Sequence, residues 1–176
     1  MTAADADAPI FLVGFMASGK TTIGRLLAER LGWAFADLDE LVTRAAGRTV
    51  SEIFAAEGEA GFRLRETGAV REAAGKRRIV VATGGGAACR EENLAAMLAA
   101  GRVVALAVSP EEAIRRVGGA SGRPLLDGKA DPLGEARRLL EARRPFYDRA
   151  HIRCQTDGRS PREIADALVD QLPGAA

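Results

Sequence analysis

A short apolar run, Ile10–Val13, leads directly into a glycine-rich turn, and helical periodicity begins where the turn ends. The turn reads Gly14-Phe-Met-Ala-Ser-Gly19-Lys20-Thr21 and fits the pattern G-x-x-x-x-G-K-[ST]. Between a buried strand and a helix, such a turn can surround phosphate groups with its backbone N–H groups. We call it the cradle. A strand, a cradle and a helix in this order predict an α/β fold with a parallel sheet.

Runs of strand length alternate with helical segments along the rest of the chain. The other predicted strands are 33–36, 79–83, 102–108 and 151–155. Predicted helices cover 22–31, 41–46, 59–74 and 93–100, and further helices begin at the caps Thr49, Ser109, Asp131 and Ser160. The pattern predicts five parallel strands with helices on both faces. Residues 9–176 are expected to form one domain, after a flexible N-terminus of residues 1–8.

Composition argues against several classes of protein. The 176 residues carry 25 Lys and Arg against 24 Asp and Glu, mixed along the chain, which does not suggest a nucleic-acid tract or a membrane-binding patch. No apolar run approaches the roughly 18 residues of a membrane span, and the acidic N-terminus is unlike a targeting signal, which favours the cytoplasm. Cys89, Cys154 and the single histidine, His151, do not support a zinc site or Ser-His-Asp catalysis. Nothing requires more than a monomer.

The cradle predicts a site for a nucleoside triphosphate and Mg²⁺, with Lys20 reaching the β and γ oxygens and the Thr21 hydroxyl bound to the metal. The motif alone leaves a small-molecule kinase, a GTP-driven switch and an ATPase module open. However, the chain has no Asn-Lys-x-Asp sequence for guanine. Its apolar runs 79–82 and 103–108 also lack the terminal acidic residue of a motor-type ATPase. These observations favour the kinase.

A kinase needs an acceptor site, and several residues could build one. Asp37 and Asp39 follow the second predicted strand, where one could lie near the metal's water shell and the other could accept a hydrogen bond from the attacking hydroxyl. Taken alone, they are more simply interpreted as surface caps. Gly84–Gly86 could let a ligand approach bare backbone, or form a plain loop. Arg63 and Arg143 could each bind a carboxylate, or be solvated helix arginines.

Taken together, six motifs in order and register resemble the shikimate kinase family over residues about 9–172. They are the cradle, Asp37-x-Asp39, Gly61-Phe-Arg63, Ala82-Thr-Gly-Gly-Gly86, Arg123-Pro-Leu-Leu126 and Arg143-x-Pro-x-Tyr147. The resemblance implies a three-layer P-loop kinase fold of the nucleoside-monophosphate-kinase type, with a five-stranded parallel sheet and a mobile lid. It also implies transfer of the ATP γ-phosphate to the 3-hydroxyl of shikimate, with Mg²⁺ as cofactor, in aromatic amino-acid biosynthesis.

The same resemblance assigns roles on the acceptor side. Asp39 would hold the shikimate hydroxyls and act as the base, and Asp37 would support Mg²⁺ through water. Arg63 and Arg143 would clamp the shikimate carboxylate. A backbone amide within Gly84-Gly85-Gly86 would bind a ring hydroxyl.

On the nucleotide side, the resemblance implies ATP contacts from Ala17, Ser18, Gly19, Lys20, Thr21 and Thr22. Arg123 lies in the expected lid, 118–130, and would close onto the phosphates as a catalytic residue. Arg116 and Arg159 match positions that flank adenine. Ala17 stands where the family usually has glycine, so a positive φ at this position would strain the cradle and weaken nucleotide binding.

Other functions fit part of the pattern. Gluconate kinase is the leading alternative, because its substrate is also a hydroxylated carboxylate, but it does not explain Arg143-x-Pro-x-Tyr147. A nucleoside-monophosphate kinase and a regulatory nucleotide-binding module without a small acceptor also remain open. ADP formation measured with shikimate, gluconate and AMP separates these alternatives.

Overall fold

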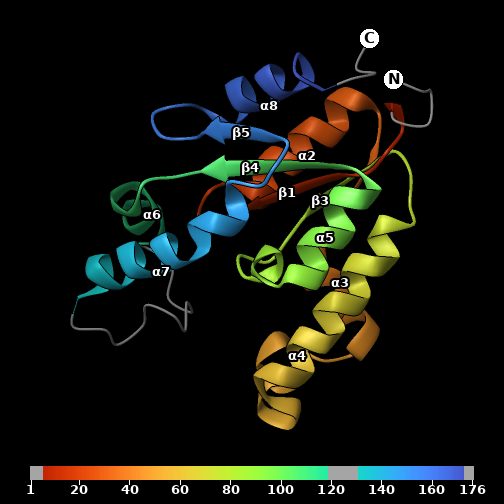
Figure 1. Cartoon of the computed structure of the whole chain (residues 1–176), viewed down its shortest axis with the longest axis vertical. Coiled ribbons are helices and arrows are strands. Elements are labelled where there is room, and N and C mark those ends of the chain that lie inside the picture. Colours follow the sequence, from red (N-terminus) through yellow and green to blue (C-terminus); the bar gives the residue numbers. More distant parts are fainter. Residues whose placement is uncertain (1–5, 119–130, 173–176) are drawn as a thin grey trace.

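The computed structural model describes residues 6–118 and 131–172, and its centre is a five-stranded parallel sheet (Figure 1). The strands are β1 (Ile10–Gly14), β2 (Ala34–Asp37), β3 (Ile79–Ala82), β4 (Arg102–Ala107) and β5 (Ile152–Gln155). Their order in the sheet is β2-β3-β1-β4-β5, with every neighbouring pair parallel. The predicted sheet is confirmed, and no strand end differs from the prediction by more than one residue.

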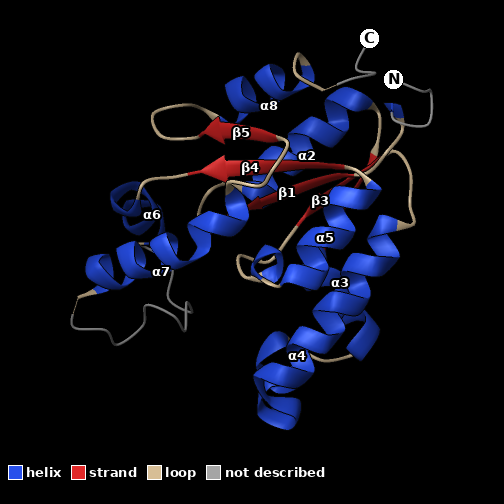
Figure 2. Cartoon of the chain, in the orientation of Figure 1, coloured by secondary structure: helices blue, strands red, loops and turns tan. Residues whose placement is uncertain are grey.

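Helices cover both faces of this sheet (Figure 2). They are α2 (Lys20–Leu31), α3 (Leu38–Ala46), α4 (Val50–Ala74), α5 (Glu91–Ala100), α6 (Pro110–Val117), α7 (Pro132–Tyr147) and α8 (Pro161–Val169), with a short 3₁₀ turn, η1 (Ala87–Cys89). The capping boxes expected at Thr49 and Ser160 are both present. The helix expected to begin at the cap Thr49 and the one expected at 59–74 run on as α4, interrupted at Gly58, where φ is 67° and ψ is −175°.

Successive residues of the central strand point to opposite layers of the core. Phe11 and Val13 pack into the cluster that also holds residues of α4, α5 and α7. Ile10 and Leu12 pack into the cluster that holds residues of α2 and α8. The strand is therefore buried on both sides, which explains why its sequence is continuously apolar rather than alternating. The result is the three-layer arrangement that the resemblance implied.

Strand pairing brings distant loops together at the carboxyl edge of the sheet. Ala82, the last residue of β3, pairs with both Leu12 of β1 and Asp37 of β2. The Thr83 amide and hydroxyl both donate to the carbonyl oxygen of Leu12, at 3.1 and 3.0 Å. The cradle, Asp37 and the three glycines after Thr83 consequently leave the sheet side by side.

Two element ends differ from the prediction for local reasons. Helix α3 begins at Leu38 rather than at residue 41, because the Asp37 carboxylate accepts a hydrogen bond from the Asp39 amide (3.0 Å) and caps the helix. His151 precedes β5 instead of starting it, and its Nδ1 accepts a hydrogen bond from the Val103 amide at 3.0 Å.

Of the N-terminal segment expected to be flexible, residues 1–5 lie outside the described residues. The carbonyl oxygen of Asp7 accepts a hydrogen bond from the Arg78 amide at 2.8 Å. The division into 1–8 and 9–176 stays a prediction. Within the described part of the chain, none of the helices combines the length and apolar character needed to span a bilayer.

Candidate active site

The cradle contains three residues with a positive φ. Gly14 has φ 143°, and a Cβ there would overlap the carbonyl oxygen of Leu106. Gly19, with φ 91°, is the N-cap of α2. Ala17 also has a positive φ, 57°, so the condition set out for a strained cradle is met. The left-handed region costs a non-glycine residue about 1–2 kcal/mol.

Lys20 is held against the backbone of its own loop. Its Nζ donates to the carbonyl oxygens of Gly14 at 3.0 Å and Phe15 at 2.8 Å. The Thr21 hydroxyl donates to Asp37 Oδ2 at 2.8 Å, which joins the cradle to the end of β2. The predicted phosphate-binding lysine and the two predicted metal-side residues therefore lie around one loop.

The bare backbone of Gly84–Gly86 is surrounded by the predicted acceptor residues. A Cβ on the first glycine would lie 3.1 Å from Asp39 Oδ1, and one on the third would lie 3.1 Å from two guanidinium nitrogens of Arg63. A Cβ on the middle glycine would lie 3.5 Å from Arg143 Nη1. Side chains from α3, α4 and α7 thus converge on one segment, and a Cβ would crowd them at its first and third positions.

Helix α7 fixes the middle of this segment with two donors. Arg143 Nη1 donates to the carbonyl oxygen of Gly85 at 3.1 Å, and the Tyr147 hydroxyl donates to the same oxygen at 2.7 Å. The Arg143 guanidinium carbon also lies 5.7 Å from the centre of the Phe15 ring, within the cradle. Arg143 therefore connects the cradle to the acceptor segment.

A cavity of about 430 Å³ opens beside the cradle. Its lining includes the predicted nucleotide residues Ala17, Ser18, Gly19, Thr22, Arg116 and Arg159. Arg116 is fixed at this cavity because its guanidinium donates to the carbonyl oxygens of Ala17 at 3.1 Å and Thr156 at 2.9 Å. Phosphate-loop residues and both expected adenine neighbours therefore share one space.

Comparison with known proteins identifies the family. A family model described as shikimate kinase matches residues 16–173. A shikimate kinase from Symbiobacterium thermophilum is 52% identical over 166 residues, which cover 93% of this chain and 95% of the relative. The chain belongs to the shikimate kinase family. A second shikimate kinase, from Streptomyces coelicolor, is 47% identical over 164 residues, covering 93% of this chain and 94% of the relative.

Solved structures agree with this membership. A shikimate kinase from Acinetobacter baumannii in complex with shikimate superimposes with a TM-score of 0.89 at 38% identity, covering 96% of this chain and 94% of that one. A gluconokinase from Sinorhizobium meliloti reaches a TM-score of 0.60 at 18% identity, which shows a shared fold alone. The predicted family and the P-loop kinase fold are confirmed.

The sequence motifs did not single out Glu66, which lies beside the predicted acceptor residues. Glu66 is fully buried, and Arg63 Nη1 donates to its Oε2 at 2.9 Å. A Cβ on Gly84 would lie 2.9 Å from the other carboxylate oxygen. Burial raises the pKa of Glu66, although the Arg63 guanidinium opposes this shift. The available signal was the spacing, because residues three apart on a helix lie on the same face.

Cys89 lies next to the same site. The thiol is half-buried near Arg143 and Tyr147, and burial raises the pKa of Cys89. A thiol held in its neutral form is a poor nucleophile. Cys89 packs against the core cluster beside the site.

One predicted catalytic residue cannot be placed. Arg123, and all of the expected lid 118–130 except Gly118, lie outside the described residues. The roles assigned to the other site residues remain predictions, which their convergence supports.

The oxygen atoms at the cradle fit Mg²⁺. The Thr21 hydroxyl and the Asp37 carboxylate are hard donors joined by a 2.8 Å hydrogen bond. Magnesium usually binds one or two such groups, keeps several waters and takes further ligands from nucleotide phosphates. The two side chains are the number and kind that such an ion requires from the protein.

Proposed function

We propose that this chain transfers the γ-phosphoryl group of ATP to the 3-hydroxyl of shikimate, giving 3-phosphoshikimate and ADP. The observation that carries the proposal is the convergence of Asp39, Arg63 and Arg143 on the Gly84–Gly86 backbone, one strand away from the cradle. A hydroxylated carboxylic acid needs cations for its carboxylate and an acceptor for its hydroxyl protons. These residues supply both.

The cradle would hold the nucleotide. Its backbone N–H groups and the N-terminus of α2 would surround the phosphates, while Arg116 and Arg159 would flank the adenine. Lys20 would leave the carbonyl oxygens of Gly14 and Phe15 for the phosphate oxygens, where its charge stabilises the transition state. Thr21 would bind Mg²⁺ directly and Asp37 through water; the ion would neutralise charge on the phosphates.

The acceptor side would orient one hydroxyl towards the γ-phosphorus. Arg63 and Arg143 would bind the carboxylate, and Glu66 would keep the Arg63 guanidinium in place. Asp39 would take the hydroxyl proton as the oxygen attacks. The new P–O bond then forms as the bond from the γ-phosphorus to the bridging oxygen breaks, and ADP leaves with that electron pair.

An assay of ADP formation tests this proposal directly. Shikimate, gluconate and AMP are compared at equal concentrations, with shikimate methyl ester as the control for the carboxylate clamp. We expect turnover with shikimate, much weaker turnover with the ester, and none above background with the other two. Faster turnover with gluconate or AMP than with shikimate would overturn the proposal.

The proposal also includes the oligomeric state of the enzyme and the compartment in which it acts. We expect the active species to be a monomer. We also expect it to act in the cytoplasm.

A further inference from the structure

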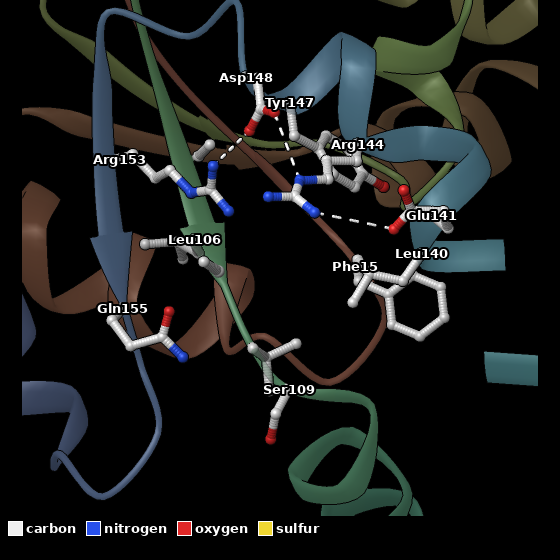
Figure 3. A pocket seen from close by; sticks show the side chains of 13 residues that line it. Phe15, Leu106, Ser109, Leu140, Glu141, Arg144, Tyr147, Asp148, Arg153 and Gln155 are labelled. Atoms are coloured by element: carbon white, nitrogen blue, oxygen red, sulfur yellow. Dashed lines mark hydrogen bonds and ion pairs between the residues drawn. The ribbon is translucent and has the colours of Figure 1, made fainter. Parts of the chain in front are cut away.

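A second cavity, of about 280 Å³, lies on the other side of α7 from the acceptor segment, between α7, β4 and β5 (Figure 3). Its origin is a mismatch in side-chain size. Strand β4 contributes Ala105 and Ala107 to the lining, and their methyl groups leave space beneath the helix. Strand β5, the edge of the sheet, contributes Arg153 and Gln155.

The base of this pocket is apolar and its opening is charged. Phe15 and Ala105 are almost fully buried, at 1% and 2% exposure, and Leu140 adds to the apolar wall. At the opening, the guanidinium groups of Arg144 and Arg153 point into the pocket (Figure 3). Small-molecule sites likewise combine an apolar wall with polar groups that orient the ligand, although the polar share of this lining is larger than usual.

The two arginines share a single strong carboxylate partner. Arg153 is paired with Asp148. Arg144 approaches the same carboxylate only at 3.6 Å and Glu141 only at 3.8 Å, and both distances exceed normal hydrogen-bond length. Asp148 and Glu141 therefore make only long contacts with Arg144. The N–H groups of Arg144 can donate to a ligand carboxylate placed between the two guanidinium groups.

We propose that this pocket binds a small organic carboxylate with a planar apolar body. Its carboxylate would lie between Arg144 and Arg153, and its apolar body would rest on Phe15, Ala105 and Leu140. The volume fits, because a cavity of about 150 Å³ accommodates benzene and the larger pocket has room for a carboxylate as well. Exposed ion pairs contribute little, so we expect a dissociation constant on the order of 1 mM.

The pocket is separate from the acceptor site but shares two walls with it. Phe15 also lies under Arg143, and Tyr147, which lines the pocket, donates to Gly85. A benzoate ion could in principle bind the Arg63 and Arg143 clamp instead. The experiment must therefore locate the bound ion, and it does not depend on the kinase activity.

Benzoate titrated to about 10 mM into the ¹⁵N-labelled full chain, with shikimate in excess, provides this test. We expect amide shifts at Ala105, Ala107 and Gln155. Arg144→Gln removes one charge and should weaken binding about two- to fivefold, the range for an exposed ion pair. Ala107→Leu fills the space and should weaken binding at least about tenfold. The matched control is Arg138→Gln, on the same helix but paired with Glu135 outside the pocket lining, and it should leave the affinity unchanged.

Three results would overturn the proposal. These are no amide shifts at all, shifts confined to Gly84–Gly86, and unchanged affinity in both Arg144→Gln and Ala107→Leu. Arg144 is largely exposed, so its variant will fold even if the larger side chain at position 107 is not tolerated. Benzyl alcohol, which lacks the negative charge, should bind more weakly than benzoate; equal binding would also exclude the arginine pair as the recognition element.

Discussion

Asp39 approaches the Gly84–Gly86 backbone from α3 with a single carboxylate. In the proposed reaction, this carboxylate accepts the proton of the acceptor hydroxyl. Asp39→Asn keeps the size of the side chain but loses the proton acceptor. We expect kcat to fall by roughly 10²–10⁴, as for removal of a general base, while the KM for ATP changes little. Steady-state kinetics with both substrates varied provide the measurement. A variant with nearly unchanged kcat would remove Asp39 from the role of base.

Arg143 makes a different kind of contact, because a guanidinium presents two parallel N–H groups to a carboxylate. Arg143→Lys keeps the charge and loses this geometry. The KM for shikimate should rise about tenfold or more, equivalent to about 1.4 kcal/mol. Arg144→Lys is the matched control, because Arg144 lines the pocket on the other side of α7. The KM of this variant for shikimate should equal that of the wild-type protein. Equal KM values for the two variants would contradict the carboxylate clamp.

Ala17 is the one residue of the cradle whose backbone conformation does not suit its side chain. Ala17→Gly relieves about 1–2 kcal/mol of strain and restores part of the entropy of the unfolded chain. We expect a net gain of about 0.5–1 kcal/mol in the free energy of unfolding, measured by urea denaturation. Because the strain is already present without nucleotide, it is common to the free and the bound protein, so the weaker nucleotide binding expected from the sequence does not follow from it. The KM for ATP should change less than about threefold. A destabilised Ala17→Gly variant would show that the alanine is not strained.

Among the elements, α4 contains a break that one glycine makes possible. Gly58 has φ 67° and ψ −175°, a region that is essentially restricted to glycine, and a Cβ there would meet no atom within 4 Å. Gly58→Ala should therefore lower the free energy of unfolding by about 1–3 kcal/mol through backbone strain alone.

Gly68, on the same helix, is the matched control. It is also exposed, and a Cβ there also meets nothing within 4 Å, but its backbone is helical. Gly68→Ala should raise the free energy of unfolding by about 0.5–1 kcal/mol. If both variants shifted the denaturation midpoint in the same direction, the break at Gly58 would have no energetic basis.

Most elements could be predicted because their signals are local. Thr49, Ser109 and Ser160 each accept a hydrogen bond from the amide three residues later, as the sequence pattern required. The short η1 turn carried no such signal. Its amides donate to carbonyl oxygens three residues earlier, from Ala87 to Gly84 at 3.1 Å and from Cys89 to Gly86 at 3.0 Å.

For the molecule as a whole, the single histidine offers a clean pH dependence. His151 Nδ1 accepts the Val103 amide and must be unprotonated, and burial together with the charge of Arg102 lowers its pKa below 6.5. The unfolded chain therefore takes up a proton first as the pH falls. This contribution to folding stability is complete above pH 6.5 and is lost progressively below it.

The measurement is urea denaturation from about pH 8 to about pH 5, with His151→Gln as the reference, because a glutamine oxygen accepts the same amide without titrating. The wild-type protein should lose more stability than the variant. Glu66 has the opposite effect on stability as the pH falls, because its pKa in the folded state is raised above 4.5. Both proteins contain Glu66, so its contribution cancels when their stabilities are subtracted. Parallel profiles would exclude His151 as the origin.

Family and fold could be predicted from the sequence because six short motifs each carry their own chemistry. Contacts between residues that are distant in the sequence could not be predicted in this way. Glu66 reads as an ordinary helix carboxylate until the fold buries it beside Gly84 and Arg63. The pocket beneath α7 likewise depends on two small residues of β4 lying opposite a helix about 30 positions further along the chain.

The glycines of the acceptor segment also limit how this enzyme family member could be redesigned. Any side chain at the first or third position would come within 3.1 Å of a functional group, and one at the middle position would approach Arg143. A side chain at the first position would have to displace Glu66 or Asp39, and one at the third would have to displace Arg63. New acceptor preferences would have to come from the side chains of α3, α4 and α7, with the loop left as it is.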